Sequence, residues 1–209
     1  MSLEVTFLGT GSAYPGTARG AAALALRRHG DCWLFDCGEG TQTQLMRSHL
    51  RAARITKIFI THLHGDHFFG LPGLLCTLSL QRGPEPSKAP VDIYGPVGLR
   101  SFLWRSLELS HSQLLFPCAV HELLPTPDQC PAGEFRDFSG WDTGEAAPQS
   151  FPGRILHLDP GEDSYLLLED EQLVLRAFRL FHRVPSFGFV LEEKPRPGKL
   201  DVQRLKELG

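Results

Sequence analysis

The sequence lacks any long hydrophobic run. No apolar stretch approaches the ~20 residues that a helix needs to cross a bilayer, so we expect no membrane contact for this chain. It also lacks a basic stretch followed by an apolar one: MSLEVTFLGTGSAYP begins as a short strand, which predicts no signal peptide. Its 21 glycines and 16 prolines form no repeating triplet, which excludes a collagen-like chain.

Cysteine pairs and strong charge are also absent. No two cysteines form a CxxC motif, and an odd number cannot form a closed set of disulfides. A reducing compartment therefore fits best, and we expect the cytosol or the nucleus. The net charge of -3 does not by itself indicate a nucleic-acid binder, although a local basic patch can be enough to hold a phosphate backbone. The five cysteines are Cys32, Cys37, Cys76, Cys118 and Cys130.

The amino-acid composition is that of a globular protein. With 209 residues, 42% hydrophobic and 22% charged, it can bury a core. Short apolar runs bounded by Gly, Asp or Arg predict strands, and longer runs with helical spacing predict helices. The expected early strands are residues 5–8, 21–26, 32–35, 55–61 and 91–94, with a turn at Gly95-Pro96. The expected helices are 41–50, a second one from the end of HLHGDH through FFGLPGLLCTLSL, and 97–109.

The second half of the chain predicts strands and one irregular segment. Residues 125–153 carry five prolines and four glycines, which is typical of an insertion without regular structure. Residues 165–168, 173–181 and 187–191 predict consecutive antiparallel strands with a hairpin turn at 169–171. We therefore expect a mixed α/β (α+β) class around a largely β core, in one domain over residues 1–193, followed by a basic tail over 194–209.

The most informative stretch is IFITHLHGDHFFGLPG. An apolar strand there delivers His62, His64, Asp66 and His67 within six positions. Imidazole nitrogens and carboxylate oxygens suit zinc at ~2.0–2.2 Å, and a turn at Gly65 lets neighbouring side chains converge. His62 and His64 are placed to bind one ion, and Asp66 and His67 to face a second. The alternative is a solvated polar loop.

Two ions in one site predict hydrolytic chemistry. Metals ~3.5–4 Å apart can share a hydroxide and stabilise charge on a phosphoryl or acyl centre. Asp66 is then the candidate catalytic residue, because its carboxylate could accept the proton of that water or fix its orientation.

Two further residues have open interpretations. His182 follows the strand over 173–181, so it is either a ligand at a strand end or a surface histidine. Asp36 ends a strand in LFDCGEG and is either an acceptor that orients a ligand histidine or a cap of the helix at Thr41. Gly9-Thr10-Gly11-Ser12 favours a tight turn over a phosphate loop, because no helix follows it. Structural or exposed roles are expected for His29, His49, His111, His121 and His157.

Four blocks together resemble one family. THLHGDH, preceded by FLGTGSAYP and DCGEGTQTQLM and followed by HRVPSFGF, is similar to the short-form ribonuclease Z (tRNase Z, ELAC-type zinc phosphodiesterase) of the metallo-β-lactamase superfamily. HxHxDH alone is shared with glyoxalase II, lactonases and β-lactamases, so the flanking blocks carry the narrower resemblance. They span residues 4 to about 200.

The resemblance implies an αββα sandwich with two zinc ions, and hydrolysis of the tRNA precursor after the discriminator nucleotide to leave a 3′ hydroxyl. It implies His62, His64 and His182 on one zinc, Asp66 and His67 on the other, and Asp66 as proton acceptor. It further implies a homodimer, and that residues 194–209 begin the arm that holds the tRNA.

The chain departs from the family pattern in its second half. That pattern also needs an aspartate bridging both metals and a late histidine, but no histidine follows His182 and the only later aspartate is Asp201. We therefore expect an N-terminal portion of the sandwich, truncated to the first half and the start of the arm. Two alternatives stay open: a thioester or lactone hydrolase on the same fold, and a non-catalytic truncated form.

Overall fold

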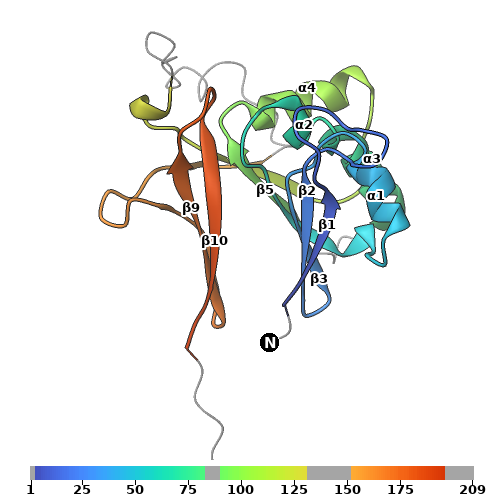
Figure 1. Ribbon diagram of the computed structural model, residues 1–209. Coiled ribbons are helices and arrows are strands. Elements are labelled where there is room, and N and C mark those ends of the chain that lie inside the picture. The colour runs from blue at the N-terminus through green and yellow to red at the C-terminus, as the bar shows by residue number, and fades with distance from the viewer. Residues whose placement is uncertain (1–2, 83–89, 131–151, 196–209) are drawn as a thin grey trace, which may run out of the picture.

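The computed structural model describes residues 3–82, 90–130 and 152–195, which form a layer of helices and two sheets (Figure 1). The first sheet has seven strands in sequence order: β1 (Leu3–Gly9), β2 (Ala23–Arg28), β3 (Asp31–Phe35), β4 (Ile55–Phe59), β5 (Val91–Pro96), β6 (Cys118–Leu123) and β7 (Ile155–Leu156). The second has three, in the order β10 (Ser186–Glu193), β9 (Leu173–Leu180), β8 (Tyr165–Glu169). The helices are α1 (Thr41–Arg47), α2 (Gly65–Phe68), α3 (Leu71–Arg82) and α4 (Leu99–Leu109), with short 3-10 turns η1 (Ala52–Arg54) and η2 (Pro127–Gln129).

The first sheet changes direction at β3. Strands β1, β2 and β3 pair antiparallel, and β3 to β7 pair parallel. Parallel neighbours need a crossover, and α1, α3 and α4 lie in those connections. All three helices lie on the same side of the sheet in Figure 1, as right-handed crossovers require. The carboxyl ends of the parallel strands therefore meet at one edge, where α2 begins.

The central strand β4 is buried on both faces at its carboxyl end, where Ile58 and Phe59 are adjacent apolar residues. Ile58 faces the helices and belongs to a core with Leu74 of α3 and Leu103 of α4. Phe59 points the other way, into a second core between the two sheets. Strands covered on both faces read as continuous hydrophobic runs rather than alternating ones. Sequence alone therefore locates β4 but does not say what covers each face.

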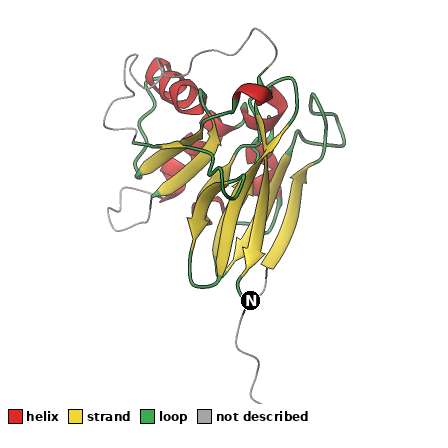
Figure 2. Cartoon of the chain, turned by 90° about the vertical axis from the view of Figure 1, so that its left-hand side faces the viewer, coloured by secondary structure: helices red, strands yellow, loops and turns green. Residues whose placement is uncertain are grey.

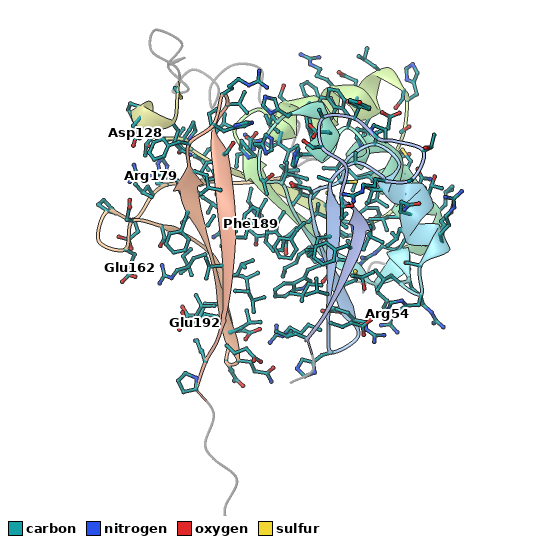
Figure 3. All side chains as sticks on the ribbon, in the orientation of Figure 1. Arg54, Asp128, Glu162, Arg179, Phe189 and Glu192 are labelled. Atoms are coloured by element: carbon teal, nitrogen blue, oxygen red, sulfur yellow. The ribbon has the colours of Figure 1, made fainter. Side chains whose placement is uncertain are left out.

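The second sheet covers the face of the first that the helices leave open, and its strands lie in front of the first sheet in Figure 2. Phe189 of β10 points toward the first sheet (Figure 3), with its ring centroid 5.5 Å from that of Phe59. In the described part of the chain, one layer of helices and two sheets form three of the four layers of an αββα sandwich. The expected mixed α/β class with a largely β core is confirmed.

A polar contact also joins the turns of the two sheets, at the end of the sandwich away from α2 (Figure 1). Arg28 donates to the carboxylate of Asp170 at 2.7 Å and to Gln172 at 3.1 Å. The hydrogen bond from Arg28, with help from backbone N–H groups, lowers the pKa of Asp170 to about 2. The pair spans 142 positions, so it helps hold β9, and the segment that follows it, against the first sheet.

Most predicted elements are confirmed, with three corrections. Gly95-Pro96 is not a turn, because β5 continues through Pro96, where it pairs with Leu123. Strands β6 and β7 were not predicted. The prediction of one long second helix is wrong. The segment forms two helices, α2 and α3, which separate around Gly70 and not at Pro72. The parts of the predicted segments that fall on 83–89, 131–151 and 196–209, including most of the insertion and of the basic tail, lie outside the described residues.

The break in that helix has a steric cause. At Gly70 the chain runs directly against another backbone: its N–H donates to the Cys37 carbonyl at 2.9 Å. A Cβ at position 70 would lie 2.2 Å from the carbonyl oxygen of Gly38. Backbone atoms cannot yield as a flexible side chain does, so only glycine fits here. This contact fixes the loop between β4 and α3 against the loop that follows β3.

Gly70→Ala is therefore expected to lower the free energy of unfolding by about 1–3 kcal/mol, the usual cost of forcing extra atoms into a packed site. Urea denaturation of both proteins measures it. Gly16→Ala is the matched control, because the nearest atom to its added Cβ would be 4.0 Å away. Equal midpoints for Gly70→Ala and Gly16→Ala would contradict the steric explanation.

Candidate metal centre

The candidate site lies where the two sheets meet at one edge. Strand β4 ends at Phe59, and the chain continues through Thr61 into the loop that carries His62 and His64. His182 lies in the loop between β9 and β10. The two segments are fastened together here, because the Phe187 N–H donates to the Thr61 carbonyl at 2.9 Å. Functional residues of parallel sheets commonly lie beyond the carboxyl ends of their strands, as these do.

Three histidines converge at this edge. One ring nitrogen from each of His62, His64 and His182 lies within 4.8 Å of the other two. His182 Nε2 is 3.2 Å from His64 Nδ1, although the residues are 118 positions apart. The planes of the three rings stand at 82–85° to one another. This is the only group of three potential metal ligands found within 3–82, 90–130 and 152–195.

Asp66 and His67 form a second pair of donors beside the cluster. His67 Nε2 lies 3.4 Å from Asp66 Oδ2, and the His67 ring centroid is 4.0 Å from that of His62. The Ala13 N–H donates to Asp66 Oδ2 at 2.8 Å, so the loop after β1 holds this carboxylate in place. All five predicted site residues therefore lie together: three in the histidine cluster and two next to it.

The proton positions of two histidines follow from their partners. Asp36 accepts from the Thr61 N–H at 2.8 Å, and the Thr61 hydroxyl lies 2.9 Å from Asp36 Oδ2. An ionised carboxylate only accepts, so the single hydroxyl proton goes to Asp36. The hydroxyl must then accept from His62 Nδ1, 2.9 Å away. This arrangement leaves His62 Nε2 without a proton and able to bind a cation.

Asp36 orients a second ring directly. His67 Nδ1 donates to Asp36 Oδ2 at 2.7 Å, which leaves His67 Nε2 to face Asp66. The interpretation of Asp36 as an acceptor for a site histidine is thus confirmed. The alternative of helix capping is wrong, because the N-cap of α1 is Gly40, with no side-chain capping bond. The role of Thr61 was not predicted, although its place immediately before His62 in THLHGDH was a possible signal.

The electrostatics favour neutral imidazoles at His62 and His64. Burial, followed by the charge of neighbouring His67, lowers the pKa of His62 to about 4. Burial and the neighbouring His182 lower the pKa of His64. Burial alone would lower the pKa of His67, but the hydrogen bond and charge of Asp36 outweigh it and raise the pKa. Only neutral histidine binds a metal ion, so His62 and His64 need no deprotonation near pH 7.

Other candidates from the sequence have structural partners. The turn after β1 folds back on itself, since the Gly11 N–H donates to the Gly20 carbonyl at 2.8 Å. His29 contacts Gln172, His49 contacts Glu4 and His121 contacts Asp92. All five cysteines are free thiols, as expected. A search of the described helices finds none with the length and apolar character to cross a bilayer.

Comparison with solved structures identifies the fold. The metallo-beta-lactamase fold protein YhfI from Bacillus subtilis matches with a TM-score of 0.54 at 13% identity, over 91% of this chain and 58% of that one. Human tRNase Z, short form, matches with a TM-score of 0.76 at 62% identity, over 91% of this chain and 64% of that one. The fold and the histidine-rich edge therefore define a protein of the metallo-β-lactamase fold.

Sequence comparison identifies the family within this fold class. The chain belongs to the family whose model is described as "Anti-Pycsar protein Apyc1", which matches residues 3–114, more than half of the 209. Over all 209 residues it is 65% identical to human zinc phosphodiesterase ELAC protein 1, and it is 39% identical to a ribonuclease Z of a Synechococcus species. The predicted resemblance to short-form ribonuclease Z is thus confirmed. The chain spans 58% and 54% of the length of those two relatives.

Proposed function

We propose that this chain carries a zinc site of a phosphodiesterase that processes the 3′ end of tRNA. The convergence of His62, His64 and His182 is the observation that carries the proposal. Three imidazoles with an open fourth position are a common zinc set in hydrolytic enzymes. When bound, zinc supplies a Lewis acid and an activated water at neutral pH. The relatives that match the whole chain are named zinc phosphodiesterase and ribonuclease Z, which favours a phosphodiester substrate.

In this proposal the residues divide into two groups of donors. His62, His64 and His182 hold the first ion, and Asp66 with His67 contributes to a second. Asp66 also accepts the proton of the attacking water, since the Ala13 N–H orients its carboxylate beside His67. A general base needs this kind of fixed placement before its pKa matters. The reaction is hydrolysis of a tRNA precursor after its discriminator nucleotide, leaving a 3′ hydroxyl.

The test combines metal analysis with two substrates. The purified 209-residue chain is loaded with zinc, and its zinc content is measured before and after dialysis. We expect the histidine cluster to keep one ion, because Asp66 and His67 supply only two donors at the second position. A tRNA precursor with a 3′ trailer is then supplied, and Asp66→Asn is expected to abolish any cut after the discriminator nucleotide.

Three outcomes would contradict the proposal. A chain that retains no zinc has no metal site. A zinc-loaded chain that leaves the trailer uncut, with Asp66→Asn no different, supports the non-catalytic alternative. Turnover of a glutathione thioester or a lactone without turnover of tRNA supports the other hydrolase on this fold.

The resemblance also leads us to propose that the protein is a homodimer in the cytosol or nucleus. We further propose that the metallo-β-lactamase-type domain ends at residue 193 and that residues 194–209 begin the arm that holds the tRNA. Light scattering of the purified chain tests the dimer. A mass of one chain at every concentration would contradict it.

Thr61→Val is expected to weaken zinc binding about 10- to 100-fold, the usual effect of losing a residue that orients a ligand. The physical reason is that valine neither donates to Asp36 nor accepts from His62, so the His62 tautomer is no longer set. Competition with a zinc-responsive dye measures the affinity. Thr61→Ser keeps the hydroxyl and should bind zinc nearly as tightly as the wild type, whereas a purely steric role would be preserved by Thr61→Val, which has the shape of threonine, and weakened by Thr61→Ser.

A further inference from the structure

Two exposed aromatic rings border the candidate site. A cleft of about 710 Å³ lies over the five site residues, and Tyr14 and Phe69 line it together with Arg183. Tyr14 is 75% exposed and Phe69 is 61% exposed. Large apolar side chains at such exposure usually lie singly on a surface and carry no meaning. Here two of them flank the proposed reaction centre, and the metal-site chemistry makes no use of either.

The Phe69 ring is held in place although it is exposed. Its centroid is 4.9 Å from that of Phe68 and 6.2 Å from that of Phe102, with the Phe102 ring at only 24° to it. On its inner side it covers Gly65, where a Cβ would lie 2.4 Å from a ring carbon. The ring is therefore fixed by packing and still presents most of its surface to the cleft. A ligand that stacks on it pays little entropy for ordering the side chain.

Tyr14 comes from a different part of the chain and reaches the same cleft. It lies in the loop between β1 and β2, whose position is set by the bond from the Ala13 N–H to Asp66. That bond ties the loop directly to the proposed catalytic carboxylate. Packing thus fixes the Phe69 ring, and the Ala13–Asp66 bond fixes the backbone that carries Tyr14 at the same cleft.

The cleft also has one cation available for an anionic ligand. Arg183 is exposed, follows His182 directly, and has no ion pair with any residue that the structure describes. The carboxylates that line the same cleft are Glu39 and Asp66. With a net charge of -3 for the whole chain, electrostatic attraction alone is a weak basis for holding a polyanion. Stacking has no such dependence on net charge.

We propose that Tyr14 and Phe69 form a base-stacking subsite for single-stranded RNA, with Arg183 at the backbone phosphate beside it. This inference rests on the proposed function, because it places an unpaired strand next to the scissile phosphodiester. Every nucleobase has a π face, so stacking platforms accept any sequence and are typical of proteins that bind single strands. The subsite would hold nucleotides that flank the cut, whereas the histidines and Asp66 act on the phosphodiester.

The experiment measures binding and needs no turnover. The 209-residue chain, with and without added zinc, is titrated into a nuclease-resistant 2′-O-methyl oligonucleotide of roughly 8 nucleotides, within the usual site size for single strands, and fluorescence anisotropy is recorded. Phe69→Leu and Tyr14→Leu are each expected to weaken binding about tenfold, since each removes one stacking surface. Phe69→Trp should keep it. A 2-aminopurine base in the strand should be quenched by the wild type and less by Phe69→Leu.

Two controls separate stacking from other effects. Phe7→Leu changes a ring that is 69% exposed and does not line the cleft, so it should bind as the wild type does. An abasic strand of the same length and charge should bind the wild type as weakly as the normal strand binds the double variant Tyr14→Leu/Phe69→Leu. Circular dichroism confirms that each variant is folded.

The inference would be overturned by equal binding of the abasic and normal strands, by an equal loss in Phe7→Leu, or by no binding of the wild type. None of these outcomes depends on cleavage or metal content. A chain that stacks the strand but neither retains zinc nor cuts tRNA would overturn the proposed function and leave the subsite standing.

Discussion

His64→Ala is expected to weaken zinc binding by more than about 100-fold, a larger effect than that of losing a residue that only orients a ligand. His64 is central to the cluster: its ring lies 4.9 Å from both His62 and His182, between centroids. Two imidazoles without the third leave zinc two ligands short of its tetrahedral preference. Competition with a zinc-responsive chelator measures the loss, and elemental analysis after dialysis confirms it.

Thermal unfolding gives a second readout for the same variant. A ligand that binds only the folded state raises its stability by RT ln(1 + [L]/Kd), ≈ 2.7 kcal/mol at 100 times Kd. Wild-type chain should therefore unfold at a higher temperature when zinc is added, and His64→Ala should not respond. His157→Ala is the control, because His157 is an exposed histidine outside the cluster. A zinc response in His64→Ala equal to that of His157→Ala would contradict the three-histidine site.

Phe59→Ala is expected to lower the free energy of unfolding by about 3–5 kcal/mol, at the upper end for core truncations. The side chain is fully buried between the two sheets. Its ring stacks on Phe35 at 4.8 Å and on Tyr94 at 5.2 Å, and it meets Phe189 of the second sheet at 5.5 Å. Removing it leaves a cavity at the junction that positions His182 relative to β4. Urea denaturation followed by circular dichroism measures the change.

Leu109→Ala is the matched control for that loss, since Leu109 is 80% exposed at the end of α4. Surface substitutions of this kind usually stay within about 0.5 kcal/mol. Phe59→Leu should fall between the two, because it removes the aromatic contacts but fills most of the volume. If Phe59→Ala and Leu109→Ala unfolded at the same urea concentration, the inter-sheet core would not be the main support of the second sheet.

The elements that could be predicted are those with a local signal. Apolar runs of strand length correctly located β1 to β5 and β8 to β10, since burial leaves a pattern within a few residues. The break at Gly70 could not be predicted in the same way. It depends on the Gly38 carbonyl, 32 positions earlier, and no periodicity within the helical segment reports a contact of that kind.

The residues of the candidate site show the same contrast between local signals and contacts of distant residues. Sequence alone predicted that the side chains of His62, His64, Asp66 and His67 converge, because they follow a strand end within six positions and a turn at Gly65 lets neighbours meet. The sequence left His182 and Asp36 each with two interpretations. Packing brings His182 Nε2 to 3.2 Å from His64, which favours its interpretation as a ligand, and the adjacent ends of β3 and β4 place Asp36 between Thr61 and His67.

Exposure was also decided only by the tertiary structure. Phe68 and Phe69 are adjacent and chemically identical in sequence, yet Phe68 is buried in the helix–sheet core and Phe69 is 61% exposed in the cleft. Both rings contact Phe102 of α4, but Phe68 belongs to the core with the helices and the sheet, whereas Phe69 lies at the rim of the cleft. A residue's chemistry is thus contained in the sequence. Whether it contributes to the core or to a binding surface depends on which residues, distant in the chain, the sheets and helices bring beside it.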